Sequence, residues 1–286
     1  MPELPEVETI VRDLRPLLVG RTITAVERDE EELRKPWKPE WEHDLIARKF
    51  KALNRRGKWI LCEMTRKAIL VFHMGMTGQL TVHPQTEERR DHTHLILSLR
   101  PGQCELRFRD TRRFGSATLY KNDTYLQSFF ESIRLGPEPF ELDPERFQTS
   151  LAQTTRCIKA VLLDQQTVAG LGNIYVDEIL FEAQIHPSRI SGDLTASEVK
   201  RIRESIPRVL TEAIEHRGSS IRNFIGGSGL QGGYQNEFLA YGRGGLPCSR
   251  CDSTMKQMQI SGRTSCFCPV CQPVPRQTRI VKKSRK

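Results

Sequence analysis

The sequence predicts an α+β protein in which a helix and a strand-rich region are followed by a helical region and a small metal-binding module. Three observations predict this order. Apolar residues recur at helical spacing over residues 3–18 and again over 145–217, strand-like runs occupy residues 21–120, and five of the eight cysteines lie within 248–271. A chain of 286 residues is long enough for two domains and such a module.

The N-terminal helix is predicted over residues 3–18. Its apolar positions are three or four residues apart and would share one face: Val7, Ile10, Val11, Leu14, Leu17 and Leu18. Pro5 stands in the first turn, where a missing backbone N–H costs little. Glu3 and Glu6 suit the positive end of the helix dipole, so the composition of the first turn agrees with the apolar spacing.

The next hundred residues change to strand-length runs separated by turn residues. These runs are Trp59–Met64, Ala68–Met74, Gln79–Val82, His94–Leu99 and Glu105–Arg109. Strands joined by such short connections pair antiparallel, which predicts a β-sandwich or a barrel. A proline- and acid-rich stretch begins at Gly136, so we expect an N-terminal domain over residues 1–135 and a linker over 136–146.

A helical domain is expected over residues 147–234. Two helices flank the turn 169–173, Ala-Gly-Leu-Gly-Asn, and a third begins at Thr195, where Glu198 completes a capping-box pattern. Backbone N–H groups in the glycine turn suit a phosphate, to which Lys159 would add a charge. A plain connection between two helices is the commoner explanation of such a turn.

Two Cys-x2-Cys pairs, Cys248 with Cys251 and Cys268 with Cys271, are separated by sixteen residues. Four thiolates at this spacing are typical of tetrahedral zinc, and four protein ligands leave no position for water. We therefore expect one structural zinc ion in a module over residues 235–272, the alternative being an accidental clustering. The other cysteines are not expected to bind metal: Cys62, Cys104, Cys157 and Cys266.

The chain is basic, with 44 Lys plus Arg against 35 Asp plus Glu, a formal charge of +9 and a pI of about 9.3. This balance favours a polyanionic partner. Part of the surplus lies in a tail over residues 273–286, which holds six Lys or Arg and no acid and is either a disordered end or a phosphate-binding arm. No apolar run approaches the ~20 residues of a membrane span, and no signal pattern begins the chain, so we expect a cytosolic protein.

The first residues of the chain could supply an amine nucleophile. Removal of Met1 would leave Pro2 as a secondary amine at a helix start, where the positive helix end disfavours its ammonium form. Attack of such an amine on a sugar C1′ gives an iminium directly, and Glu3 and Glu6 lie within reach as acid or base. The residues alone do not establish this chemistry, because Met-Pro-Glu is also an ordinary way to begin a helix.

Five motifs occur together and in order: MPELPEVET at 1–9, HMGMTG at 73–78, DTRRFG at 110–115, AGLGNIYVDE at 169–178, and the Cys-x2-Cys pairs. Together they closely resemble the formamidopyrimidine-DNA glycosylase family of bacterial-type repair enzymes, over residues 2 to about 272. The resemblance implies a β-sandwich lobe, a helix–two-turn–helix lobe and a zinc finger that grip duplex DNA. It implies removal of oxidised purines, such as 8-oxoguanine and formamidopyrimidines, and cleavage of the abasic site by β,δ-elimination. We expect a monomer, associated with the nucleoid in a prokaryotic-type cell.

The resemblance also implies roles for individual residues. Pro2 would be the Schiff-base nucleophile and Glu3 the proton donor in base release, while Lys58 and Arg263 match the proton donors of the β- and δ-elimination steps. The positions that would bind the DNA backbone are His73, His92, Arg112, Lys159 and Asn173. The residues that would fill the space left by an extruded base are Met76, Arg112 and Phe114.

Two alternatives remain at this point. An endonuclease VIII-type glycosylase would prefer oxidised pyrimidines, but Leu4 and the wedge at 112–114 favour the purine branch. A non-catalytic DNA-damage-binding protein would share the same lobes, and the presence of all the predicted catalytic residues argues against it.

Overall fold

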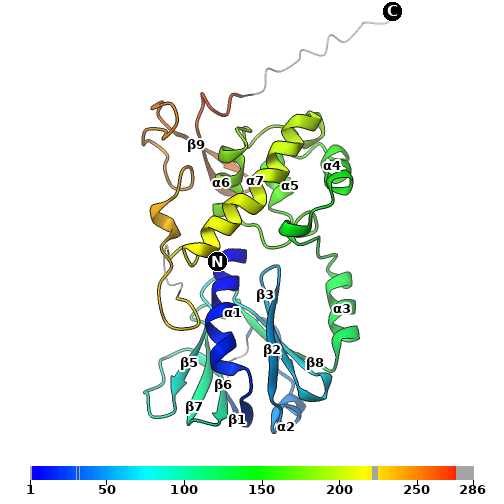
Figure 1. Cartoon of the computed structure of the whole chain (residues 1–286), viewed down its shortest axis with the longest axis vertical. Helices are drawn as coiled ribbons and strands as arrows, with labels where there is room; N and C mark the ends of the chain where they lie inside the picture. Colours follow the sequence, from blue (N-terminus) through cyan, green and yellow to red (C-terminus); the bar gives the residue numbers. More distant parts are fainter. Residues whose placement is uncertain (1, 30, 32, 221–224, 275–286) are drawn as a thin grey trace, which may run out of the picture. The chain divides into compact units, whose positions relative to one another are not determined.

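The computed structural model describes residues 2–29, 31, 33–220 and 225–274 (Figure 1). The chain divides into two compact units, and neither is continuous in sequence. The first consists of residues 1–142, 164–172 and 206–237, and the second of 143–163, 173–205 and 238–286. The domain boundaries expected near residues 135, 146, 234 and 272 remain predictions.

The first unit contains two four-stranded antiparallel sheets, in the strand orders β1-β6-β7-β5 and β2-β3-β4-β8. The strands of the first sheet are β1 (Thr22–Arg28), β6 (Thr93–Arg100), β7 (Cys104–Arg109) and β5 (Gln79–Pro84). Those of the second are β2 (Phe50–Arg56), β3 (Trp59–Met64), β4 (Ile69–His73) and β8 (Ser116–Tyr120). Phe72 of β4 and Phe108 of β7 pack with ring centroids 5.5 Å apart, so the two inner faces form one core. The predicted sandwich is confirmed, rather than the barrel.

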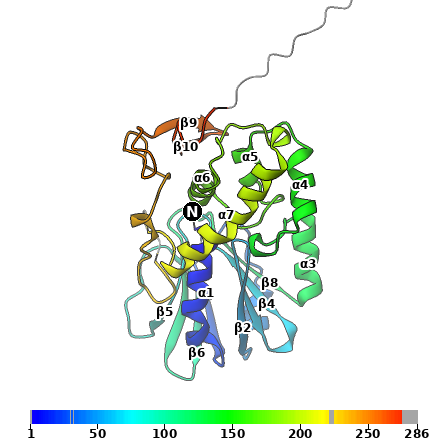
Figure 2. The same cartoon turned by 45° about the horizontal axis from the view of Figure 1, so that its top comes forward.

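Helix α1 (Leu4–Leu18) buries its apolar face in this core, as its spacing predicts. It contacts β2 and β3 of one sheet and β5 of the other (Figure 2). The first unit also contains helices α2 (Glu40–Leu45) and α3 (Asp123–Ser132) and the 3-10 turns η1 (Thr65–Lys67), η2 (Pro139–Glu141) and η4 (Tyr234–Asn236). The N-terminal segment is therefore held by a rigid element that both sheets support.

The second unit is helical with one hairpin. Its elements are α4 (Pro144–Ala152), α5 (Ile158–Leu162), α6 (Asn173–Glu182), η3 (Ser191–Asp193), the first half of α7 (Ala196–Glu215), β9 (Lys256–Ile260) and β10 (Arg263–Phe267). The predicted capping box is present, because the Thr195 N–H donates to Glu198 Oε2 at 2.7 Å and the Glu198 N–H donates to Thr195 Oγ1 at 3.3 Å. Within the described residues, no helix combines the length and apolar character that crossing a bilayer requires.

Candidate active site

The start of α1 is enclosed by the glycine turn at 169–172. The Leu4 N–H donates to the Gly170 carbonyl at 3.0 Å, and Pro2 and Glu3 are buried. A Cβ on Gly172 would lie 2.3 Å from Glu3 Cδ, and Gly170 combines a φ of +91° with a similarly close approach to Leu4. The glycines are thus required by contact with the N-terminal segment, a function that the phosphate interpretation of this turn did not include.

Glu6 connects the helix start to a distant segment of the same unit. Its Oε2 accepts the Glu3 N–H at 2.8 Å, and its Oε1 accepts the N–H and the hydroxyl of Ser219 at 2.8 and 3.0 Å. The side chain is buried, and Gly218, with φ +72°, leaves no room for a Cβ beside Glu6 Oε1. Three donors therefore hold this carboxylate in one orientation. Ser219 carries no motif that could have identified it from the sequence.

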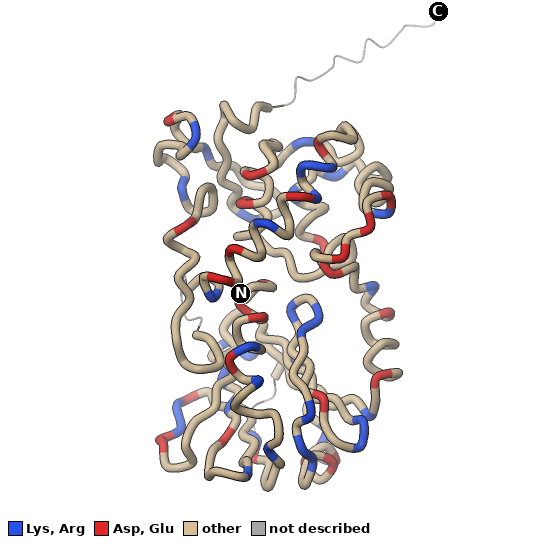
Figure 3. The backbone as a smooth tube through the Cα atoms, viewed as in Figure 1, with Lys and Arg blue, Asp and Glu red and all other residues tan. Residues whose placement is uncertain are grey.

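Lys58 lies in the turn of the β2–β3 hairpin, whose tip is rich in basic residues (Figure 3). Glu138 orders this turn: its Oε1 accepts the Gly57 N–H at 2.6 Å, and its carboxylate pairs with Arg55 and Arg56 at 2.7 and 2.9 Å. A Cβ on Gly57 would lie 3.1 Å from the Cβ of Ala169. The Lys58 turn and the N-terminal segment therefore pack against the same turn of the chain. Glu138 was missed because its stretch was expected to be a linker.

His73 ends β4 and presents a defined tautomer. Its Nδ1 accepts the Gly75 N–H at 3.1 Å, so the proton of the neutral ring resides on Nε2, which can donate. Burial, together with the nearby charges of Lys58 and Arg34, lowers the pKa of His73 to about 4. At neutral pH, His73 can thus bind a phosphate oxygen through a hydrogen bond but adds no charge.

Two loops bring the predicted wedge residues together. Met76 and Phe114 are 38% and 43% exposed, which is unusual for apolar side chains of this size, and the Arg112 guanidinium lies 4.6 Å from the centre of the Phe114 ring. Gly75, with φ +56°, lies so close to the Phe114 backbone that a Cβ would approach it to 2.4 Å. The Asp110 carboxylate accepts the backbone N–H of both Gly115, at 2.7 Å, and Arg112, at 3.2 Å.

His92 is exposed in a left-handed backbone conformation, with φ +64°. Its carbonyl accepts the Asp110 N–H at 3.0 Å. It is therefore joined to the loop at 110–115 through the backbone, and its side chain is available to solvent. Its predicted contact with DNA remains a prediction.

In the second unit, the hairpin that carries Arg263 is attached to α6. The Thr264 carbonyl accepts hydrogen bonds from Asn173 Nδ2 at 3.2 Å and from Lys159 Nζ at 3.3 Å. Lys159 also pairs with Asp177 Oδ1 at 2.6 Å, and both side chains are fully buried. Burial raises the pKa of Asp177 to about 6, although the Lys159 charge opposes this shift.

The contact of Lys159 with the DNA backbone remains a prediction. In the second unit, the Lys159 ammonium lies between Asp177 and the Thr264 carbonyl and is buried. Asp177 Oδ2 also accepts the Cys266 N–H at 3.1 Å, so the buried pair holds the backbone of β10 at two positions. Arg263 itself is exposed at the start of this strand.

The four predicted zinc ligands converge. The Sγ atoms of Cys248 and Cys271 are 3.9 Å apart, those of Cys251 and Cys268 3.4 Å, and those of Cys251 and Cys271 3.5 Å. A tetrahedron with zinc–sulfur bonds of roughly 2.3 Å has edges of about 3.8 Å, so the set fits one structural zinc ion. Cys266 is outside the cluster, as expected. Of the remaining cysteines, Cys62 and Cys104 are buried and Cys157 is half-buried.

Two side chains attach the zinc module to α6. Arg250 donates to the Phe181 carbonyl at 3.1 Å and lies over the Phe181 ring. Glu178, which is buried, accepts three backbone N–H groups, from Leu239, Ala240 and Tyr241, at 2.7–3.0 Å. Arg250 and Glu178 therefore anchor the module to this helix.

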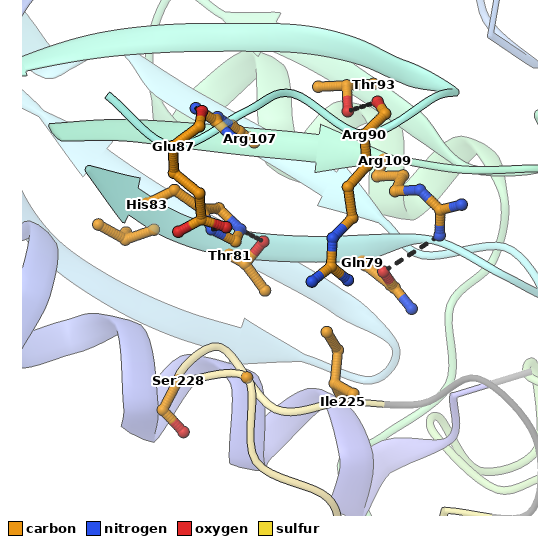
Figure 4. A pocket seen from close by; sticks show the side chains of 12 residues that line it. Gln79, Thr81, His83, Glu87, Arg90, Thr93, Arg107, Arg109, Ile225 and Ser228 are labelled. Atoms are coloured by element: carbon orange, nitrogen blue, oxygen red, sulfur yellow. Dashed lines mark hydrogen bonds and ion pairs between the residues drawn. The ribbon is translucent and has the colours of Figure 1, made fainter. Parts of the chain in front are cut away.

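A polar cavity of about 360 Å³ lies between strands β5 and β7 and the glycine segment after residue 225 (Figure 4). Arg90 and Arg109 line one side, and Ile225 and Ser228 lie across from them. None of the predicted catalytic residues lines this cavity, so the active site is not located here.

Comparison with known families matches three segments of the chain. Residues 1–117 match the formamidopyrimidine-DNA glycosylase N-terminal domain, residues 135–225 the H2TH domain of the same enzymes, and residues 245–274 a zinc finger found in FPG and IleRS. The chain is 39% identical to the formamidopyrimidine-DNA glycosylase of Carboxydothermus hydrogenoformans, over 95% of its length and 100% of the relative. It is 41% identical to that of Desulforamulus reducens, over 95% and 99%.

Solved structures give the same result. A Lactococcus lactis FPG variant bound to DNA containing Fapy-dG superposes with a TM-score of 0.89 at 35% identity, covering 96% of this chain and 100% of that one. The Lactococcus lactis enzyme bound to an abasic site superposes with a TM-score of 0.88 at 35% identity, covering 95% and 100%. The fold and the site thus define a two-unit, zinc-containing protein of the kind that binds damaged DNA. The chain belongs to the formamidopyrimidine-DNA glycosylase family.

Proposed function

We propose that the protein excises oxidised purines from duplex DNA and then cleaves the strand at the resulting abasic site. The observation that carries this proposal is the burial of Pro2, Glu3 and Glu6 at the start of α1, where Gly172 packs against Glu3 and Ser219 holds Glu6. Solved structures similar to this chain are complexes of a protein with DNA that contains Fapy-dG, an abasic site or carbocyclic 8-oxo-G.

In the proposed reaction, the Pro2 nitrogen attacks C1′ of the damaged nucleotide and the bond from C1′ to the base breaks. Glu3 donates a proton to the departing base, and Glu6 keeps Glu3 in place through its backbone N–H. The attached nitrogen gives up its proton, and the C1′–O4′ bond of the sugar then breaks while O4′ takes up a proton. The resulting iminium between Pro2 and C1′ withdraws electrons. Loss of the C2′ proton then expels the 3′ phosphate, with Lys58 as the proton donor. A second elimination expels the 5′ phosphate, with Arg263 as the proton donor.

For DNA binding, we propose that His73, His92, Arg112 and Asn173 contact the backbone and that Lys159 acts indirectly. Half or more of the hydrogen bonds between proteins and DNA go to phosphate and sugar, and a neutral Nε2–H such as that of His73 is a suitable donor. Lys159 holds the Thr264 carbonyl and, through Asp177, the Cys266 N–H. It is therefore proposed as a positioning residue for the hairpin of Arg263.

Cleavage of lesion-bearing duplexes tests this function. We expect excision and nicking of strands with 8-oxoguanine or formamidopyrimidine opposite cytosine, and much slower reaction with thymine glycol. The opposite ranking would assign the chain to the endonuclease VIII type. Tight binding without a nick in any of the three duplexes would identify a non-catalytic damage-binding protein.

The wedge makes a second prediction. Phe114→Ala and Met76→Ala should lower excision of a base-paired lesion by about 10-fold, because unstacking a base costs a few kcal/mol that these side chains offset. Nicking of a pre-formed abasic site should change much less, since no base must be extruded. Phe140→Ala, which removes an equally exposed phenylalanine elsewhere in the same unit, is the control. Equal losses on both substrates would show that the two residues act through folding.

A further inference from the structure

A small cavity lies beside β1 and β6 in the first unit, away from the residues assigned to catalysis. Its volume is about 20 Å³, enough for one water-sized occupant. The residues that line it are Arg28, Asp29, Glu31, Leu33, Trp37, His94 and Leu95. The two carboxylates are partly exposed, whereas His94 is 3% exposed. The cavity therefore joins a solvent-accessible acidic edge to a buried imidazole.

The hydrogen bonding of His94 determines which ring nitrogen faces this cavity with a lone pair. Its Nε2 lies 2.9 Å from the Asp110 carbonyl, which can only accept, so Nε2 carries the proton. In the neutral ring, Nδ1 is then an acceptor, and it lies 3.4 Å from Asp29 Oδ2, a second acceptor. Nδ1 is buried and has no hydrogen-bond partner among the described residues. Two acceptors that face each other need a proton, a bridging water or a metal ion between them.

The geometry matches a metal ion. Ligand atoms of Asp29, Glu31 and His94 all lie within 4.8 Å of one another. Bonds of roughly 2.0–2.1 Å to a tetrahedral zinc ion place neighbouring ligands about 3.4 Å apart, which is the separation of His94 Nδ1 and Asp29 Oδ2. A metal-binding histidine usually donates its other N–H to a carbonyl or carboxylate, as His94 does to Asp110. Trp37 Nε1, also buried without a partner among the described residues, can donate to a water on the metal.

We propose that Asp29, Glu31 and His94 bind a second divalent metal ion of the zinc class, distinct from the ion of the four cysteines. One imidazole with two carboxylates favours zinc and similar transition metals over magnesium or calcium, which prefer oxygen ligands alone. The site is joined to the wedge loop, because the Asp110 carboxylate organises residues 112–115 and Arg113 pairs with Glu31 at 3.1 Å. Binding of the metal thus moves the Glu31 carboxylate away from the Arg113 guanidinium.

Titration of Zn²⁺ into the full-length protein, with its cysteine site already loaded, tests the proposal. Elemental analysis and calorimetry should detect a second equivalent of zinc. Asp29→Asn and Glu31→Gln are at partly exposed positions and should weaken this second binding at least 10-fold while the first zinc is retained. Glu87→Gln is the matched control, because Glu87 pairs with His83 at 2.8 Å in another histidine–carboxylate pair of the same unit.

Arg113→Gln should have the opposite effect and tighten the second site about threefold or more, because it removes a competing cation from Glu31. In ¹⁵N-histidine spectra, zinc should shift the Nδ1 resonance of His94 and leave Nε2 protonated. The proposal is overturned if no second equivalent binds at ~1 mM Zn²⁺, or if binding survives the Asp29→Asn, Glu31→Gln double variant. It is also overturned if His94 is found protonated on both nitrogens and unaffected by zinc. The proton on Nδ1 would then take the place of the metal between His94 and Asp29.

Discussion

Glu3→Gln is expected to reduce excision of 8-oxoguanine by about 10²–10⁴-fold and to affect nicking of a pre-formed abasic site far less. Glu3 is buried, and Gly172 fits closely against its Cδ, so an isosteric amide can occupy the same space. The amide cannot donate the proton that the departing base requires, but the Pro2 amine remains. The measurement is the single-turnover rate on two duplexes that differ only in the presence of the damaged base. Glu40→Gln, at the exposed start of α2, is the control for loss of a helix-start carboxylate.

Borohydride reduction provides the matching test of Pro2. It should trap the iminium between enzyme and abasic DNA in both the wild-type protein and Glu3→Gln, and the adduct should map to the N-terminal peptide. Pro2→Gly retains an N-terminal amine, so some trapping can persist, whereas a retained Met1 would convert the Pro2 nitrogen to an amide and abolish it. An adduct on Lys58 with Pro2 unmodified would overturn the assigned nucleophile but leave the glycosylase function standing.

The parts of the fold that follow from local patterns could be predicted. The apolar spacing of residues 3–18 gave α1 to within one residue, and the bounds of β3 were those expected. Helix α3 was not predicted, although Asn122 caps it by accepting the Tyr125 N–H at 3.3 Å. Its apolar residues pack on the outer face of the β4 sheet rather than in the main core, so no strong signal marks it.

The site divides in the same way. The residues that perform chemistry lie in short motifs, so Pro2, the zinc ligands and the wedge could be proposed from sequence. The residues that hold them in place could not, because their partners are distant in the chain: Ser219 is 213 positions from Glu6, and Glu138 is 81 from Gly57. Lys159 is an example: its hydrogen bond to Asp177, a residue 18 positions away inside the second unit, could not be predicted from the sequence.

Loss of zinc is the second change that should have a large effect, on the folding of the zinc module and on DNA binding. Cys268→Ser is expected to release the metal, unfold residues 248–271 and weaken binding to lesion-containing duplex DNA at least 100-fold. The structural reason is that β9 and β10 lie between the two cysteine pairs, so the metal closes the loop that presents Arg263. Structural zinc contributes roughly 10–16 kcal/mol to the folding of such modules, far more than one two-stranded hairpin supplies alone.

Cys266→Ser is the matched control for this prediction. It is the same substitution two residues away, at a buried cysteine outside the metal cluster whose N–H bonds to Asp177. This variant should keep one zinc in the cysteine site and bind duplex DNA within a few-fold of wild type. Cys268→Ser protein that retains that zinc and its affinity would show that the four cysteines are not the ligand set. If instead the zinc is lost and affinity is unchanged, Lys159, Asn173 and Asp177 hold the Arg263 hairpin without the metal.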